Sequence, residues 1–138
     1  MSAVISTATY NGQYAPKHVL AAWITNSAGT FIKSLMVYAA ARKSDLTNWV
    51  SSSSGSTTDA VVGATLSSHS SHSLSWNGTN KSGTVVDDGT YKLNVEFTES
   101  NGTGKYTSFT FTKGTSAFSA TSSSANNITL TSLTWTPQ

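Results

Sequence analysis

Thr90-Tyr-Lys-Leu-Asn-Val-Glu-Phe-Thr98 is the stretch of this 138-residue sequence that decides the fold class. Every second side chain is apolar, a period that is typical of a β-strand with one face toward a core. The apolar members are Tyr91, Leu93, Val95 and Phe97. We expect the alternate positions, Lys92, Asn94 and Glu96, to face water. The stretch therefore predicts a strand with one dry and one wet face.

Two β-hairpins follow from this kind of pattern. The strand at 90–98 is followed by a Gly-containing segment at 101–104 and by a second alternating run at 105–112. Together these three segments predict a hairpin. Upstream, the apolar runs 18–25 and 30–38 are separated by the turn residues 26–29. They predict a second hairpin, whose strands are largely buried because both runs are mostly apolar.

Further strands are expected at 4–10, 73–76 and 127–135. The two halves of the last segment are out of phase, which predicts a β-bulge near Ser132. At most one short helix is expected, near 44–50. Seven to nine short strands with so little helix predict an all-β fold, an antiparallel β-sandwich that forms one domain.

The composition limits the classes of function. About a third of the residues are hydroxylic, with 25 Ser and 22 Thr, and only 10% are charged, against about 25% in an average domain. The absence of Cys excludes a disulfide framework, a thiolate metal site and a Cys nucleophile. The net charge of +2 comes from scattered cations, so no nucleic-acid partner is expected. No apolar run approaches the length of a membrane span. The composition favours a periplasmic or extracellular protein whose signal peptide has been removed.

One motif carries a resemblance to known domains. It is Trp76-Asn-Gly-Thr-Asn-Lys-Ser-Gly83-Thr-Val-Val-Asp-Asp-Gly89-Thr-Tyr91, with glycines where turns need positive φ. It resembles the Trp-(Asp/Asn)-Gly…Gly…Val…Gly-x-Tyr signature of small bacterial Ig-like domains, including the Ig-like module of flagellar hook-capping proteins. The resemblance implies that the sandwich is Ig-like.

Other segments extend this resemblance over residues 14–113. Four further segments precede the motif: 14–24, 29–35, 46–49 and 59–65. Their sequences and their order resemble a family of predicted bacterial periplasmic proteins of unknown function. The resemblance implies an exported sandwich and brings no catalytic residues with it. Members are often encoded beside flavin-transferase and PepSY-type membrane proteins implicated in iron reduction. This implies an alternative role as a metal- or redox-associated accessory protein.

Two histidines are the best candidates for metal ligands. His69 and His72 would converge on an ion only if residues 67–72 form a turn, because residues three apart on a strand point to opposite faces. A third ligand for copper or zinc would be needed, and the residues considered for it are His18, Asp59 and Glu96. The alternative is one histidine at the edge of the core and one in an exposed loop.

A calcium site and a hydrolase triad are further alternatives. Asp87 and Asp88, with Asn77 and Asn80, supply oxygen ligands of the kind that Ca²⁺ prefers, but turns capped by these side chains explain the same residues and are the favoured interpretation. No Gly-x-Ser-x-Gly elbow accompanies the many serines, and a serine near a histidine is expected by chance here. We therefore expect no enzymatic activity and no resident cofactor.

Aromatic and edge residues suggest two kinds of partner. Trp49 lies near the end of the expected helix and is the tryptophan most suited to stack on a glycan, as in a carbohydrate-binding module. The terminal segments carry few charges, so their edges could pair with another copy. The residues predicted to form this assembly edge are Val4, Ile5, Ile128 and Leu130. The sequence thus favours an exported, non-enzymatic structural or binding domain that self-associates through its edge strands.

Overall fold

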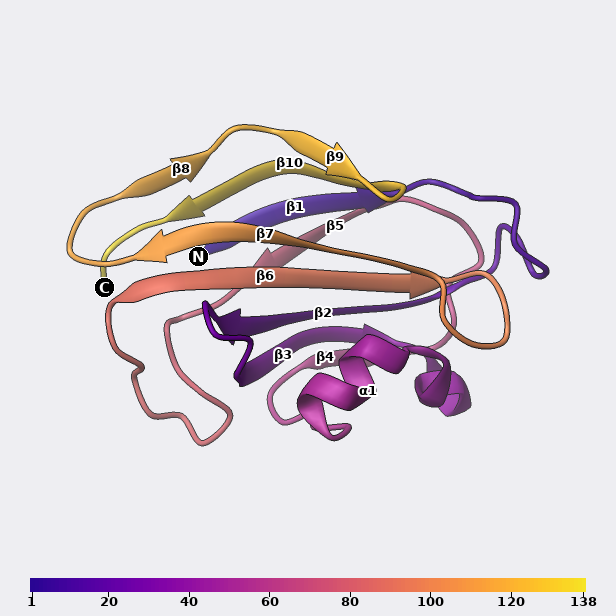
Figure 1. The fold of residues 1–138 in the computed structure, drawn as a ribbon, viewed down its shortest axis with the longest axis horizontal. Coiled ribbons are helices and arrows are strands. Elements are labelled where there is room, and N and C mark those ends of the chain that lie inside the picture. The colour runs from indigo at the N-terminus through magenta and orange to yellow at the C-terminus, as the bar shows by residue number, and fades with distance from the viewer.

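The computed structural model describes all residues from 1 to 138 as two five-stranded sheets packed face to face (Figure 1). The elements in chain order are β1 (Ser2–Thr7), β2 (Val19–Asn26), β3 (Phe31–Tyr38), a 3-10 helix η1 (Ala40–Asp45), α1 (Thr47–Ser53), β4 (Val61–Gly63), β5 (Ser71–Ser75), β6 (Gly89–Thr98), β7 (Lys105–Lys113), β8 (Phe118–Ala120), β9 (Ser123–Ala125) and β10 (Ile128–Trp135). The all-β sandwich is confirmed. The strands number ten because β4, β8 and β9 have only three residues each.

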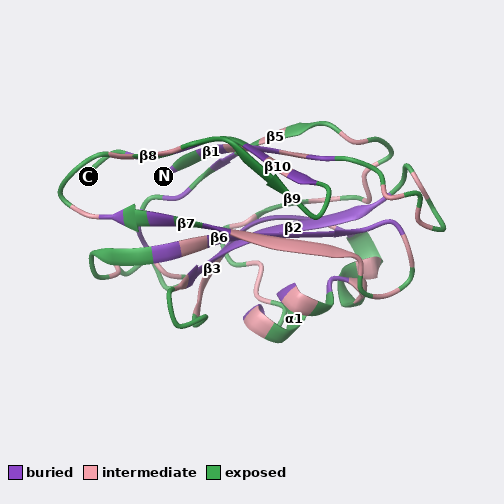
Figure 2. Cartoon of the chain, turned by 45° about the horizontal axis from the view of Figure 1, so that its top comes forward, coloured by how far each residue is buried: buried purple, intermediate pink, exposed green.

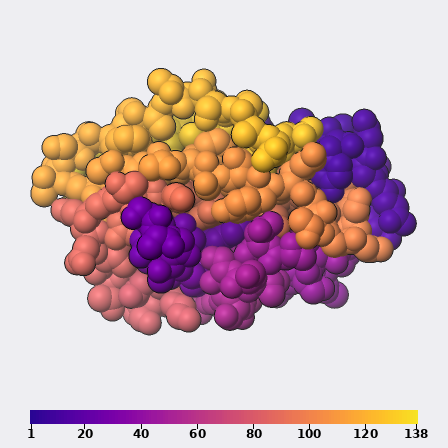
Figure 3. Space-filling view, viewed as in Figure 1, coloured from indigo at the N-terminus to yellow at the C-terminus, as the bar shows by residue number.

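The two sheets differ in strand order. The first has the order β5-β1-β10, with both β8 and β9 pairing with the outer side of β10. The second has the order β4-β3-β2-β6-β7 and contains both predicted hairpins, β2–β3 and β6–β7. Only β4 pairs in parallel, with β3. Figure 3 shows the same arrangement in space-filling form, with the C-terminal strands in yellow on one side and the helical segment in magenta on the other.

The main core lies between the sheets. The four apolar side chains of β6 that share one face are all at most 5% exposed, which confirms their predicted direction. Strand β2 is buried along nearly its whole length, whereas β9 is exposed (Figure 2). The sandwich therefore buries apolar side chains of β1, β5 and β10 in the first sheet against those of β2, β3, β6 and β7 in the second, which supplies most of the driving force for folding.

The outer face of the second sheet is also covered, and this corrects the prediction of a wet face on β6. Asn94 is 2% exposed and Glu96 is fully buried. The covering layer is η1 with α1, and a second apolar cluster, which includes Trp23 and Trp49, lies between it and the sheet. The expected helix near 44–50 is interrupted at Leu46, whose φ of −82° and ψ of 71° are not helical. Neither helical segment is long and apolar enough to cross a membrane.

The predicted bulge is present, but the predicted assembly edge is wrong. Val4 pairs with Ser132 and Ile5 with Leu130, so one residue of β10 has no partner on β1 at this point. β1 lies between β5 and β10, and β8 and β9 cover the other side of β10. Val4, Ile5, Ile128 and Leu130 are therefore inside the sheet, because segment 118–125 contributes the two short strands that pair with β10.

Candidate functional site

Glu99 is a fully buried carboxylate directly after β6. Its Oε1 accepts hydrogen bonds from the Thr9 hydroxyl (3.0 Å) and from the backbone N–H groups of Tyr10 (2.8 Å) and Gly12 (3.3 Å). Its Oε2 accepts one from His69 Nε2 (3.0 Å). Four donors from two connecting segments therefore meet on one side chain, which ties the β1–β2 connection to the end of β6.

These contacts keep Glu99 ionised. Burial by itself raises the pKa of this carboxyl, but the hydrogen bonds from His69, Thr9, Tyr10 and Gly12 lower the pKa to about 2. Gly12 is needed because a Cβ at that position would lie only 2.6 Å from the Cβ of Glu99. The close approach of backbone and carboxylate is what allows two N–H groups to reach the same oxygen.

His69 extends this network to a second ring. Its Nε2 donates to Glu99, so its Nδ1 can accept from the Thr7 hydroxyl at 2.6 Å. The His18 ring stacks on His69 with 4.1 Å between centroids and 1° between planes, and both rings meet Phe97 edge-on. Thr7, His18, His69 and Glu99 thus form one cluster between the sheets, which we call the histidine–glutamate cluster.

The structure does not assemble the predicted metal ligands. Both ring nitrogens of His69 are engaged by protein partners, while the His72 ring lies 5.9 Å from that of Tyr38. Of the other residues considered, Asp59 pairs with Lys33 (3.7 Å), and Glu96 lies on the opposite face of its sheet. No group of three or more His, Cys, Asp or Glu side chains is placed to hold a metal ion.

Burial governs the charge of the remaining two histidines. The pKa of His18 is lowered chiefly because burial disfavours the charged ring, and repulsion between a charged His18 and a protonated His69 or His72 lowers it further. The hydrogen bond to Pro16 and the charge of Glu99 act in the opposite direction. The pKa of His72 is lowered by burial alone. Both rings are therefore neutral at neutral pH.

Glu96 is a second buried carboxylate with a different set of partners. It accepts from the backbone N–H of Asn48 (3.1 Å), the Asn48 side-chain amide (2.7 Å) and the backbone N–H of Trp49 (2.8 Å). Leu46 precedes α1 and offers no side-chain cap, so Glu96 reaches across from β6 to satisfy N–H groups that begin the helix. This residue anchors α1 against the sheet.

The prediction of glycan stacking by Trp49 is wrong. Its side chain is fully buried and its indole N–H donates to the Ser34 hydroxyl at 2.9 Å. The other three tryptophans are at most 4% exposed, and each indole N–H also has a partner. Sugar stacking needs an exposed aromatic face, and α1 turns Trp49 inward because the strand face below it is apolar.

Two of the four suggested calcium ligands, Asn77 and Asn80, act as turn caps. Asn80 Oδ1 accepts from the N–H groups of Ser82 (2.9 Å) and Thr84 (3.1 Å), and Asn77 Oδ1 accepts from the Thr79 hydroxyl (2.5 Å). Asp88 accepts a hydrogen bond from Lys113 Nζ at 2.7 Å. Turn capping therefore accounts for the two asparagines, whereas Asp88 is held by an ion pair with Lys113.

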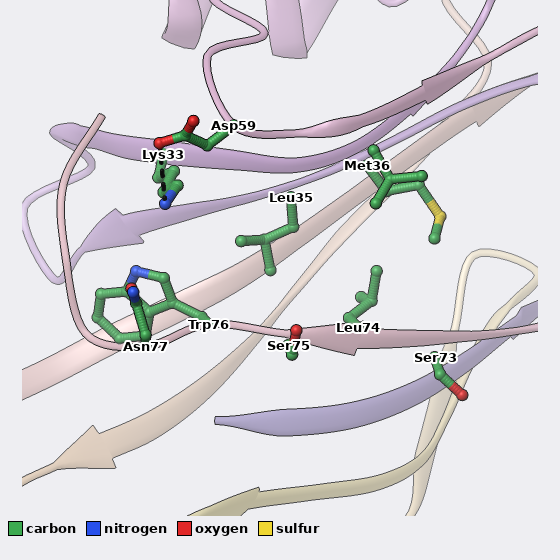
Figure 4. Close-up of a pocket in the computed structure, with 10 residues that line it drawn as sticks. Lys33, Leu35, Met36, Asp59, Ser73, Leu74, Ser75, Trp76 and Asn77 are labelled. Atoms are coloured by element: carbon green, nitrogen blue, oxygen red, sulfur yellow. Dashed lines mark ion pairs between the residues drawn. The ribbon is translucent and has the colours of Figure 1, made fainter. Parts of the chain in front are cut away.

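A groove opens on one side of the sandwich, between the edge strand β5 and strands β3 and β4 (Figure 4). Its volume is about 260 Å³. Leu35 and Met36 line one side, Leu74 and Trp76 line the other, and the Lys33–Asp59 ion pair lies at its rim. We call this feature the edge groove.

Sequence reasoning missed both Glu99 and the role of His18, although each had a detectable signal. Glu99 continues the inward-facing odd positions of β6, so its carboxylate points toward the core. His18 is likewise in phase with Leu20 and Ile24, which belong to the core. An ionisable residue in the phase of buried neighbours indicates a paired or functional group.

Fold and cluster together define an all-β sandwich with buried ionisable groups between its sheets. The chain belongs to the family of predicted periplasmic proteins designated DUF2271, whose model matches residues 2–129. This family description agrees with the location expected from the sequence. No curated protein and no solved structure matches the chain, so the Ig-like relationship stays a prediction.

Proposed function

We propose that the protein is a non-enzymatic binding domain of the periplasm, and that it takes up an extended segment of a partner protein along β5. The direction of the β5 backbone carries this proposal. The N–H of Trp76 donates to the Met1 carbonyl (2.8 Å) and the Met1 amino group donates to the Trp76 carbonyl (2.5 Å). Such pairs recur at every second residue of an antiparallel ladder. The backbone groups of Ser71, Ser73 and Ser75 therefore point away from β1.

Those outward groups have no neighbouring strand, because β5 ends its sheet. The edge groove lies beside them, so an added strand would place alternate side chains against Leu74 and Met36. Val61 of the edge strand β4 lines the same groove, is 56% exposed and extends the apolar surface. Free backbone donors next to apolar surface are the features that strand addition uses: the backbone supplies affinity and the groove supplies specificity.

Peptide selection with matched variants tests the proposal. Selection from a phage-displayed library of random peptides on the wild-type protein should enrich sequences with apolar residues at alternate positions. Binding of a selected peptide should be lost in Ser73→Pro, which removes an outward N–H donor. Ser73→Ala keeps that donor and should bind as the wild type does.

Equal binding of the peptide to wild type and Ser73→Pro, measured by calorimetry, would contradict the proposal. Light scattering on the same proteins identifies a second copy as the partner. In that case the mass of the wild type rises with concentration, while Ser73→Pro stays monomeric. A second copy of this chain is the main alternative to a partner protein, because an edge strand with few charges can pair with the same strand of another copy.

A further inference from the structure

Lys33 is a nearly buried lysine on the inner face of the second sheet. It is the partner of Ile24 in the β2–β3 register, and Ile24 belongs to the core between the sheets. Its side chain is only 12% exposed and lines the edge groove. Lysine side chains are rarely enclosed to this extent without a close partner, so the surroundings of the ammonium group are informative.

The ammonium group of Lys33 has an ion-pair partner but no hydrogen bond to the protein. Its Nζ lies 3.7 Å from Asp59 Oδ2, which is beyond hydrogen-bond distance. The Asp59 side chain is 65% exposed, so water weakens the attraction within this pair. The three N–H donors of Lys33 are therefore available inside the groove.

Lys113 shows how the same chain satisfies another lysine of similar burial. Its side chain is 7% exposed, and its Nζ donates to Asp88 at 2.7 Å. The same ammonium group lies over the ring of Trp135, 5.4 Å from the centroid. A short charge-assisted hydrogen bond of this kind satisfies an enclosed cation. Because Lys33 has no such hydrogen bond, its ammonium group is free to meet an acceptor that enters the groove.

We propose that the segment bound along β5 carries an acidic side chain whose carboxylate accepts hydrogen bonds from Lys33. This inference rests on the proposed function and names the chemistry of the partner. Side chains on one face of an added strand recur at every second residue, about 7 Å apart. Lys33 and Leu35 are also two residues apart on β3, and both line the groove. The acidic residue should therefore lie two positions from an apolar residue that contacts Leu35 and Leu74.

The incoming carboxylate replaces Asp59 as the partner of Lys33. An added strand excludes water from the groove, which strengthens a hydrogen bond between charged groups. Asp59 is exposed, so its own carboxylate stays hydrated when Lys33 changes partner. Before binding, however, Asp59 competes for Lys33 and repels the incoming acid. Loss of the charge of Lys33 and loss of the charge of Asp59 should therefore have opposite effects on affinity.

Calorimetry with peptides selected on the wild-type protein tests this inference. The library is fused to the phage coat through the C-terminus of each peptide, so an enriched carboxylate belongs to a side chain. Selected peptides should carry Asp or Glu two positions from an apolar residue. Lys33→Gln should weaken their binding about tenfold or more. Asp59→Asn should strengthen it about two- to fivefold, and Asn tolerates the positive φ of 59° at this position.

Lys43→Gln is the matched control, because it removes the same charge from an exposed residue outside the groove and should bind as the wild type does. The inference is overturned if the selected peptides lack an acidic residue, if Lys33→Gln and Lys43→Gln weaken binding equally, or if Asp59→Asn weakens it as Lys33→Gln does. If Ser73→Pro still abolishes binding in those cases, the proposed function stands and only the acidic partner is wrong. If Ser73→Pro binds the peptides as the wild type does, both proposals are wrong.

Discussion

Two buried carboxylates, three residues apart, show how one strand serves two faces of a sheet. Glu96 and Glu99 are both fully buried and each accepts several hydrogen bonds. Glu96 points outward and meets only the backbone and amide donors that begin α1. Glu99 points inward and meets His69, which stacks on His18.

The different partners of Glu96 and Glu99 indicate which side of the sheet holds ionisable groups in contact with one another. The partners of Glu96 do not titrate and serve to hold a peripheral helix. The partners of Glu99 include the ionisable ring of His69, which belongs to a cluster that joins both sheets. A substitution of Glu99 should therefore destabilise the core. Two substitutions and a change of pH test this contrast.

Glu99→Ala should have the largest effect, a loss of about 3–5 kcal/mol in the free energy of unfolding. The substitution leaves four donors without their acceptor, including His69 in the interior. Urea unfolding followed by tryptophan fluorescence measures the loss. A change below about 1 kcal/mol would show that the cluster is dispensable for the fold.

Acid should remove the contribution of Glu99 to the stability of the wild-type protein. The pKa of Glu99 is lowered from 4.5 to about 2, so its stabilisation is complete above pH 4.5 and is lost as the pH falls toward 2. A shift of this size corresponds to about 3 kcal/mol. Urea unfolding at several pH values between 6 and 2 should show that Glu99→Gln, which has no titrating group here, loses less than the wild type. Parallel curves for the two proteins would contradict this assignment.

Glu96→Ala should cost less, about 2 kcal/mol, and its effect should be local. Water can reach the N–H groups at the start of α1 once the helix loosens, whereas the His69 ring beside Glu99 is only 13% exposed and would lose its carboxylate partner inside the fold. Hydrogen exchange should accelerate in α1 and remain slow in β2 and β6. Faster exchange throughout both sheets would remove the contrast between the two carboxylates.

The sequence predicted the elements well, because their signal is local. Alternation from Tyr91 to Phe97 identified β6 and its core face, and the phase change in β10 identified the bulge opposite Val4 and Ile5. The burial of Trp49 was missed, because it depends on the apolar outer face of β2, which lies far away in sequence. The assembly edge was misplaced for a similar reason: strand order is a property of the whole fold.

What the sequence determined by itself was the class of fold, since period-two alternation and short polar turns admit little except strands in packed sheets. Tertiary structure alone decided which polar residues are buried together. Glu99 and Thr9 are 90 residues apart along the chain, and His69 and Thr7 are 62 apart. No local pattern encodes these contacts, because they form only when the two sheets pack and exclude water from the ionisable groups between them.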